Sequence, residues 1–298
     1  MLNQSVVEHV VAPELAGAEP VGWRRFGRVL RQEKLTLVGV VIVLAYLGLA
    51  LLGPAIAPYD PNQIDFSVQL APPSLAHPFG TDNVGRDVLS RVMVATRLDI
   101  GLALGAVGLA FMIGAMLGML AGYGGGWLDE VTMRTMDVIQ SFPAFILALG
   151  VVAALGQGLF NILVVVAFIN IPPYARLMRT QFLSLRERQY TEAARLAGNS
   201  PVRIVFRHLL PNALAPALAI ASLNFGWAIL TTAGLSFLGI GVKPPAAEWG
   251  QMIASGSQDL VIGAWWTSVF PGLALFVFVL GCNLLGDGIQ RLIDPQAW

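Results

Sequence analysis

The side chains that could carry chemistry are sparse, and the most patterned group lies in a predicted helix–turn–helix. Residues 190–197 form a helical octet followed by Gly198, a position where helices often end in a left-handed residue. Ser200 and Pro201 then supply an N-cap serine and a proline at the first position of a second helix. We expect this helix to end near Pro211. The pattern predicts two short helices joined by a tight turn.

This helix–turn–helix carries arginine on otherwise apolar turns, at Arg195, Arg203 and Arg207. An exposed surface that is both apolar and basic is suited to docking a partner protein. The same composition suits an interfacial helix held by anionic lipid. The residue pattern by itself leaves both interpretations open.

Motifs of enzyme chemistry are absent from the sequence. Neither lysine, Lys34 or Lys243, follows a glycine, so there is no G-x-x-x-x-G-K-[ST] phosphate loop to bind ATP. The chain also lacks H-E-x-x-H and G-x-S-x-G. Three scattered histidines and one cysteine, Cys282, predict neither a metal site nor an intrachain disulfide. We expect no catalytic residues and no cofactor in this chain.

Composition indicates the medium in which these elements lie. Of 298 residues, 56% are hydrophobic and 12% are charged, with 18 basic residues balancing 18 acidic ones. A soluble chain carries about 25% charged residues. The mean hydropathy of +0.69 excludes a soluble enzyme with a polar shell, a nucleic-acid-binding protein and a disordered tail protein. Membrane lipid is therefore an expected partner.

Stretches without charge predict an all-α membrane protein with six transmembrane helices. The third stretch has 38 residues, which is about 57 Å of helix and too long for one crossing. Its turn signal at 156–158 splits it into two spans. The five charge-free stretches are Leu35–Tyr59, Ile100–Leu128, Val138–Ala175, Leu209–Val242 and Leu260–Gly286.

The distribution of basic residues predicts that both termini are cytoplasmic. With that orientation, 14 of the 18 lysines and arginines lie on the cytoplasmic side, as the positive-inside rule requires. The chain then divides into a cytoplasmic arm (1–34), a first span with a long extracytoplasmic loop (35–97) and a core transmembrane domain (98–298). A loop at 176–211 contains the helix–turn–helix. In the extracytoplasmic loop, Gly85–Asp99 predicts a short amphipathic helix on the outer surface.

Polar side chains in the fifth span are the other candidates for function. Ser222, Asn224 and Thr231 lie in an otherwise apolar helix. An amide within a span is costly unless it faces the helix bundle or a wet path. These residues therefore predict either hydrogen bonds between helices or the lining of a translocation path.

The helix–turn–helix resembles the EAA loop of ABC importer permeases. The pattern is carried by Glu192-Ala193-Ala194, Gly198 and His208-Leu209-Leu210-Pro211. His208 replaces the general isoleucine, and with Asn212 it resembles the oligopeptide/dipeptide subfamily. Further segments similar to the C-type subunit of that subfamily are Gly80–Asp82, Gly85–Asp87, Gly126–Asp129, Met133-Arg134, Asp137, Ser141–Pro143, Pro244-Pro245, Trp249-Gly250, Asn283–Gly288 and Asp294-Pro295.

The resemblance implies a type I ABC importer permease of the bacterial inner membrane, forming half of a heterodimeric channel. The implied partners are a homologous second permease, two cytosolic ATPases that bind ATP and magnesium, and an extracytoplasmic substrate-binding protein. Short peptides are the expected cargo, with nickel chelates, opines, glutathione and oligosaccharides as alternatives. The residues implied to couple to the ATPases are Glu192, Ala193, Ala194, Gly198, His208, Leu210 and Pro211.

Two uses of Glu192 compete, and two other classes of protein remain. Glu192 pairs either with an arginine of the ATPase or with Arg188 or Arg195 of its own loop, at helical spacing. An ion-driven secondary transporter would carry charge within its spans, and a membrane scaffold would not need the EAA loop. The resemblance favours the importer and the coupling role.

Overall fold

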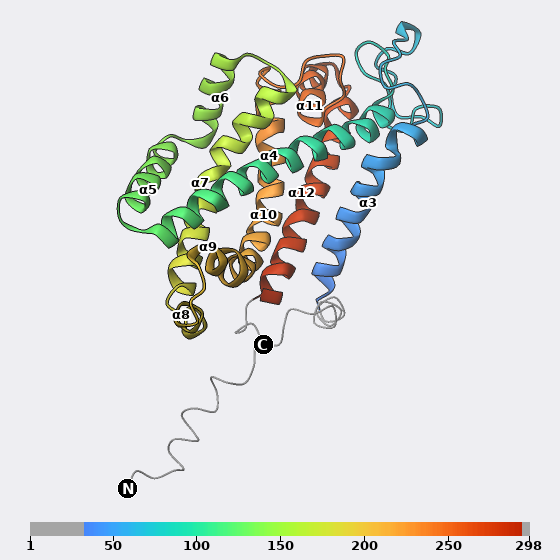
Figure 1. Cartoon of the computed structure of the whole chain (residues 1–298). Helices are drawn as coiled ribbons and strands as arrows, with labels where there is room; N and C mark the ends of the chain where they lie inside the picture. Colours follow the sequence, from blue (N-terminus) through green and yellow to red (C-terminus); the bar gives the residue numbers. More distant parts are fainter. Residues whose placement is uncertain (1–32, 294–298) are drawn as a thin grey trace.

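The computed structural model of the protein describes residues 33–293, whose regular secondary structure is helical (Figure 1) apart from one isolated bridge between Thr81 and Asp87. The predicted arm (1–34), apart from its last two residues, and the Asp294-Pro295 motif lie outside the described residues. The helices are α3 (Lys34–Ile56), α4 (Val88–Gly124), α5 (Gly126–Ser141), α6 (Ala144–Leu155), α7 (Leu159–Leu185), α8 (Gln189–Leu196), α9 (Pro201–Arg203), the π-helix η2 (Ile204–Leu209), α10 (Leu210–Phe237), α11 (Trp249–Asp259) and α12 (Trp266–Ile293), with short 3₁₀ turns η1 (Phe66–Val68) and η3 (Leu260–Ile262).

The described helices confirm an all-α membrane protein with up to six spans. Five helices are long and apolar enough to cross a bilayer, namely α3, α4, α7, the main part of α10, and α12. The sixth span is the pair α5 and α6, bent by 91°. The expected split at residues 156–158 is present, since α6 ends at Leu155 and α7 begins at Leu159.

The bend between α5 and α6 was not predicted and has a local cause. Pro143 is the N-cap of α6, and Phe142 before it has extended backbone angles. A proline disfavours the helical conformation in the residue that precedes it. The third span is therefore broken near its middle.

The expected amphipathic helix at Gly85–Asp99 is wrong as a separate element. Helix α4 begins at Val88, where the Asp87 carboxylate accepts the N–H of Ser90 as an N-cap at 2.8 Å. The helix then runs for 37 residues without a break. Arg91 and Val92 in its first turns are buried, so these turns pack inside the protein and not on an outer surface.

The last span also begins later than its charge-free stretch. Gly263 has φ +85° and ends the turn η3, and α12 starts at Trp266. The residues before it form a separate short helix, α11, which sequence analysis missed. Its N-cap is Glu248, whose carboxylate oxygens accept the N–H groups of Gly250 and Gln251.

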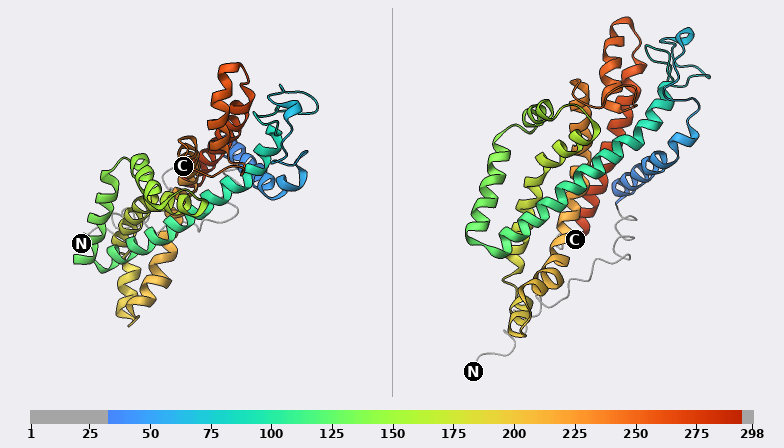
Figure 2. Two further views of the ribbon diagram at one scale, coloured as in Figure 1. Left: turned by 90° about the horizontal axis from the view of Figure 1, so that it is seen from above. Right: turned by 45° about the horizontal axis from the view of Figure 1, so that its top comes forward.

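The longest helix, α4, packs closely along α7 through glycine. A Cβ at Gly114, Gly118 or Gly122 would lie 2.2–2.7 Å from a backbone oxygen of α7. Small residues at this spacing allow helices in a membrane to approach closely. Figure 2 shows α4 running obliquely across the bundle, with α7 and α3 against it.

The bundle has two ends that carry different short elements (Figure 1). The α8 end has α8 and α9, beside the start of α3 and the end of α12. An ion pair between Glu33 and Arg291, 2.8 Å, joins these two long helices there. The α11 end has α11 and the loop between α3 and α4.

Candidate coupling surface and translocation cavity

Helix α8 ends in the predicted left-handed glycine. Gly198 has φ +75°, and its N–H donates to the Arg195 carbonyl at 2.9 Å. The next N–H, from Asn199, donates to the Ala194 carbonyl at 3.2 Å. These two bonds form a Schellman motif, which satisfies the last carbonyls of a helix. The turn therefore depends on a residue that accepts positive φ.

The second helix begins as expected but does not end near Pro211. Ser200 caps it by accepting the N–H of Arg203, and Pro201 is its first residue. The chain then passes through the π-helix η2 directly into α10, with Pro211 in the first turn of α10. A wider turn accommodates the proline, and the Leu210 N–H bonds the Val205 carbonyl five residues back.

The inner face of this helix–turn–helix packs on the ends of two spans. Ala194, Ile204 and Leu209 are buried in one apolar cluster with Met178 and Phe182 of α7. Ala213 and Ala217 of α10 belong to the same cluster. The helix–turn–helix is therefore packed against both α7 and α10.

The outer face is exposed and both apolar and basic. Leu196 is 84% exposed, and Val202 and Phe206 are 66% and 56% exposed. We call this the coupling surface; it consists of Tyr190, Glu192, Ala193, Arg195, Leu196, Val202, Arg203, Phe206 and Arg207, all exposed. Bulky apolar side chains gathered with arginine in this way are characteristic of protein interfaces.

The predicted coupling residues divide between this surface and its support. Glu192 and Ala193 are exposed, whereas Ala194 is buried. Within the described chain Glu192 forms no ion pair, so neither Arg188 nor Arg195 neutralises it. Of the distal motif, Pro211 is exposed, while His208 and Leu210 are partly buried.

Two arginines that sequence analysis assigned to the loop belong to α7 instead. Arg179 makes two hydrogen bonds to the Asp129 carboxylate of α5, and Arg176 Nη2 donates to Asp137 Oδ1 at 2.6 Å. Helix α7 continues to Leu185, and both arginines lie on it and bind carboxylates of α5. The loop that follows α7 therefore contains two fewer arginines than expected.

The bend between α5 and α6 opens a cavity of about 700 Å³ against α7 and α10. Asn224 and Thr231 of α10 line it, together with Asn170 of α7 and Gln140 of α5. No charged side chain is among its lining residues. Amide and hydroxyl groups in an otherwise apolar wall are suited to binding neutral polar groups such as peptide bonds.

Asn224 and Ser222 have different surroundings. The amide nitrogen of Asn224 and the hydroxyl of Tyr174 are both buried, and neither atom has a hydrogen-bond partner within the described residues. Ser222 lies toward α12, 3.0 Å from the position of a Cβ at Gly286, and its hydroxyl bonds the Ala219 carbonyl. The structure brings Asn224 and Thr231 to the cavity and places Ser222 outside it.

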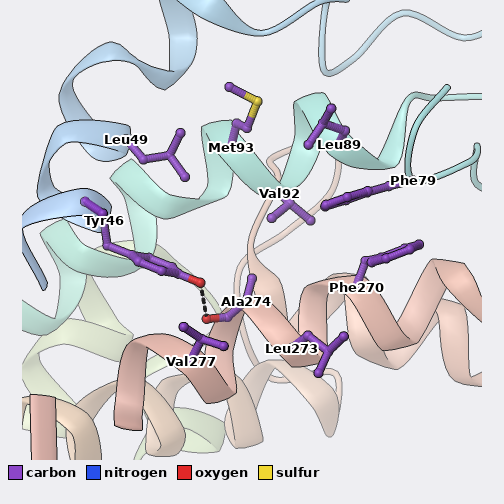
Figure 3. Close-up of a pocket in the computed structure, with 11 residues that line it drawn as sticks. Tyr46, Leu49, Phe79, Leu89, Val92, Met93, Phe270, Leu273, Ala274 and Val277 are labelled. Carbon is purple, nitrogen blue, oxygen red and sulfur yellow. Dashed lines mark hydrogen bonds between the residues drawn. The ribbon is translucent and has the colours of Figure 1, made fainter. Parts of the chain in front are cut away.

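A second cavity, of about 520 Å³, lies between α3, α4 and α12 (Figure 3). Phe79, Met93 and Phe270 are among its apolar lining residues. Its one polar side chain, Tyr46, donates its hydroxyl to the Ala274 carbonyl at 2.8 Å. This cavity therefore offers no free polar side chain to a substrate.

The comparison with protein families decides the assignment. Residues 114–298 match the family described as binding-protein-dependent transport system inner membrane component. The chain belongs to this family. Residues 23–73 of this permease also match the N-terminal transmembrane domain of oligopeptide transport permease C. It is a multi-pass transport protein of the bacterial inner membrane, and permeases of such ABC importers work with ATPase and substrate-binding partners.

Relatives of known name cover nearly the whole permease. The probable D,D-dipeptide transport permease DdpC of Escherichia coli K12 is 44% identical over 90% of both chains. The dipeptide permease DppC of Alkalihalophilus pseudofirmus is 39% identical over 92% of this chain and 90% of its own. The glutathione permease GsiD of Pectobacterium atrosepticum is 40% identical over 92% and 91%.

A solved structure supports the fold. A chain of the inward-facing MetNI methionine ABC transporter superposes with a TM-score of 0.50 at 20% identity, covering 68% of this chain and 96% of its own. The permease therefore has the type I ABC importer permease fold that its sequence resembles.

Proposed function

We propose that this chain is one half of the channel of an ATP-driven importer of short peptides. Both termini and the coupling surface face the cytoplasm, and α11 faces the outside. Two cytosolic ATPases supply the energy, one of them bound at the coupling surface, and an extracytoplasmic protein delivers the substrate. This chain itself binds no ATP, magnesium or other cofactor. The observation that carries the proposal is the coupling surface, an exposed apolar and basic face at the α8 end.

The cavity at the α5–α6 bend supports a second permease as partner. Trp227 and Phe142, which line it, are 67% and 52% exposed, and Asn224 lies behind them. Large aromatic side chains at an open cavity are suited to being covered by another protein surface. A homologous permease against this face completes the translocation path.

Short peptides are the proposed cargo because the cavity and the relatives agree. The uncharged amides of Asn170 and Asn224 pair with peptide groups of any sequence. The relatives named above are dipeptide, D,D-dipeptide and glutathione permeases, and glutathione is itself a tripeptide. Nickel chelates, opines and oligosaccharides remain the alternative cargoes, which uptake assays with each ligand distinguish.

The first experiment is purification of the tagged chain from its host in mild detergent, followed by mass spectrometry. A second permease and ATPase subunits are expected with the wild-type chain. Leu196→Asp should reduce the recovered ATPase about tenfold, because a carboxylate would be desolvated in an apolar contact. The control is Ser184→Asp, which adds the same charge at an exposed position outside the coupling surface. Equal ATPase recovery with both variants would contradict docking at this surface.

The cavity is tested with Asn224→Leu in the reconstituted complex. We expect peptide uptake to fall about fivefold to tenfold, since each lost hydrogen bond contributes roughly 1 kcal/mol, while basal ATP hydrolysis is retained. Ser222→Ala is the matched control on the same helix, and its uptake should be unchanged. If Ser222→Ala and Asn224→Leu reduce uptake equally, the cavity does not line the path.

A further inference from the structure

Two carboxyl groups lie side by side in the interior at the α11 end. Asp99 on α4 is 4% exposed, and Glu248, the N-cap of α11, is completely buried. Trp249, the residue after Glu248, donates its N–H to Asp99 Oδ2 at 3.1 Å, which brings the two carboxyl groups close together. Two ionised carboxylates that lie close together in a buried site repel each other strongly. Neither residue belongs to the coupling surface or lines the cavity at the α5–α6 bend.

Glu248 accepts more hydrogen bonds than Asp99. The two oxygens of Glu248 accept the N–H groups of Gly250 and Gln251 at 2.9 and 2.8 Å, and the Ser236 hydroxyl lies within bonding reach. Asp99 accepts one bond, from the Trp249 N–H at 3.1 Å. Its other oxygen, Oδ1, is buried and receives no donor within the described residues. Glu248 therefore has the environment of an anion, and Asp99 does not.

Within residues 33–293, no cation balances the pair. The ion pairs of the described residues include neither Asp99 nor Glu248. Arg91, two turns earlier on α4, is directed to the Pro61 and Pro245 carbonyls and to Asp82. Lys243, on the segment before α11, is exposed.

The other elements packed around the pair supply no charge either. Helix α10 has no charged residue, and the charges of α12, Asp287 and Arg291, lie near its last turns at the α8 end. The neighbouring titratable side chain of α3, Tyr46, donates to a carbonyl of α12. Burial raises the pKa of Glu248 above its usual value, although its hydrogen bonds oppose this change.

We propose that Asp99 and Glu248 form a proton-binding site, in which a protonated Asp99 donates a hydrogen bond from Oδ1 to the Glu248 carboxylate. The bound proton removes one of two like charges and satisfies the buried oxygen that has no donor. Asp99 is a positioning residue in this arrangement, acting on α11 through Glu248.

The site fixes the start of α11 against α4. Two hydrogen bonds from Trp249 already join α11 to α4. Its backbone N–H donates to Asp99, and its indole N–H donates to the Val92 carbonyl at 3.2 Å. The hydrogen bond from protonated Asp99 to Glu248 adds a third. Loss of the proton would leave two buried charges facing each other across the α4–α11 contact. The position of α11, and with it the segment leading into α12, therefore depends on pH.

Infrared spectroscopy of the purified full chain at neutral pH tests where the proton lies. The difference spectrum of wild type minus Asp99→Asn should contain the C=O band of a protonated carboxylic acid, shifted in D₂O. Wild type minus Glu248→Gln should contain a carboxylate band. Absence of the protonated band from the first difference, or its presence only in the second, would overturn the assignment.

A pH profile of thermal unfolding gives a second readout that a purely structural role would not change. A carboxyl that is protonated when folded and ionised when unfolded makes the folded chain bind one more proton, so stability falls as pH rises. Across about pH 5 to 9, the wild-type Tm should fall more steeply than that of Asp99→Asn, whose amide keeps the donor at every pH. Parallel profiles would overturn the proposal.

Glu248→Gln is the matched control in that profile. In the wild-type chain, one Glu248 oxygen accepts the Gly250 N–H and the other accepts the Gln251 N–H. Glutamine has only one side-chain oxygen, so it cannot accept these two bonds on separate oxygens. We expect a lower Tm than Asp99→Asn throughout. A Glu248→Gln chain as stable as wild type, with Asp99→Asn strongly destabilised, would place the proton on Glu248 and overturn the proposal.

Discussion

Gly198→Val is expected to leave the permease in the membrane and to abolish coupled ATP hydrolysis. Gly198 has φ +75°, and an L-residue pays roughly 1–2 kcal/mol in the left-handed region, with β-branched valine at the upper end. The chain relieves this cost by turning α8 relative to η2, which displaces the coupling surface. We expect substrate-stimulated ATPase activity and transport in the reconstituted complex to fall by about tenfold or more, consistent with a lost docking geometry.

The control for this experiment is Gly198→Asn, since asparagine tolerates the left-handed region better than other side chains. No atom of residues 33–293 lies within 4 Å of a Cβ built at this glycine, so the two variants differ in backbone preference and not in steric clash. Asparagine should retain most of the activity. Normal transport by Gly198→Val would refute the coupling role of this turn.

The second large effect is expected in the interior, from Gly118→Val. A Cβ at this position would lie 2.2 Å from the Ala175 carbonyl oxygen and 2.8 Å from the Met178 Cβ. The oxygen belongs to the backbone of α7 and the Met178 Cβ is attached directly to that backbone, so neither atom can rotate aside and α4 and α7 must separate. Overpacking costs about 1–3 kcal/mol or more, and we expect the upper end here. The measurement is the yield of monodisperse protein in detergent and its Tm.

Gly108→Val provides the comparison on the same helix. Nothing lies within 4 Å of a Cβ at Gly108, so valine there adds apolar surface without a clash. Its Tm should remain close to that of the wild-type chain. Similar losses in both variants would mean that glycine acts through helix propensity and not through contact with α7.

Local signals explain what the sequence predicted correctly. The turn at 156–158 and the end of α8 at Gly198 are each marked by glycine in the local sequence. The N-cap serine at 200 acts on its own helix. The span count, the fold class and the helix–turn–helix could therefore be predicted without tertiary contacts.

Features that depend on distant partners could not be predicted. The charged first turns of α4 are helical and buried because Arg91 finds carbonyls contributed by residues 61 and 245. Arg179 lies in α7 and binds Asp129 of α5. Asn224 and Ser222 look alike in the sequence, but they lie on different faces of α10, Ser222 toward Gly286 of α12 and Asn224 toward the cavity at the α5–α6 bend.

The buried carboxyl pair has the same origin. Asp99 and Glu248 are 149 positions apart, and each taken alone resembles a surface acid near a helix end. Pro143 at the bend and Glu248 at the N-cap of α11 can both be read from the sequence. Their structural effects depend on which helix packs opposite them.

The π-helix η2 sets the rotation of α10 about its axis relative to the coupling surface. From Pro201 to Phe237 the chain is helical without a break. Its first turns contribute Val202 and Phe206 to the coupling surface, and its later turns contribute Asn224 and Thr231 to the cavity. One residue advances an α-helix by about 100°, and a π-turn contains one residue more than the bond pattern of an α-turn. Deleting one residue at the end of η2, after Arg207, would thus turn Asn224 and Thr231 away from the cavity while leaving Val202 and Phe206 in place, which makes the wide turn the element that sets the two in register.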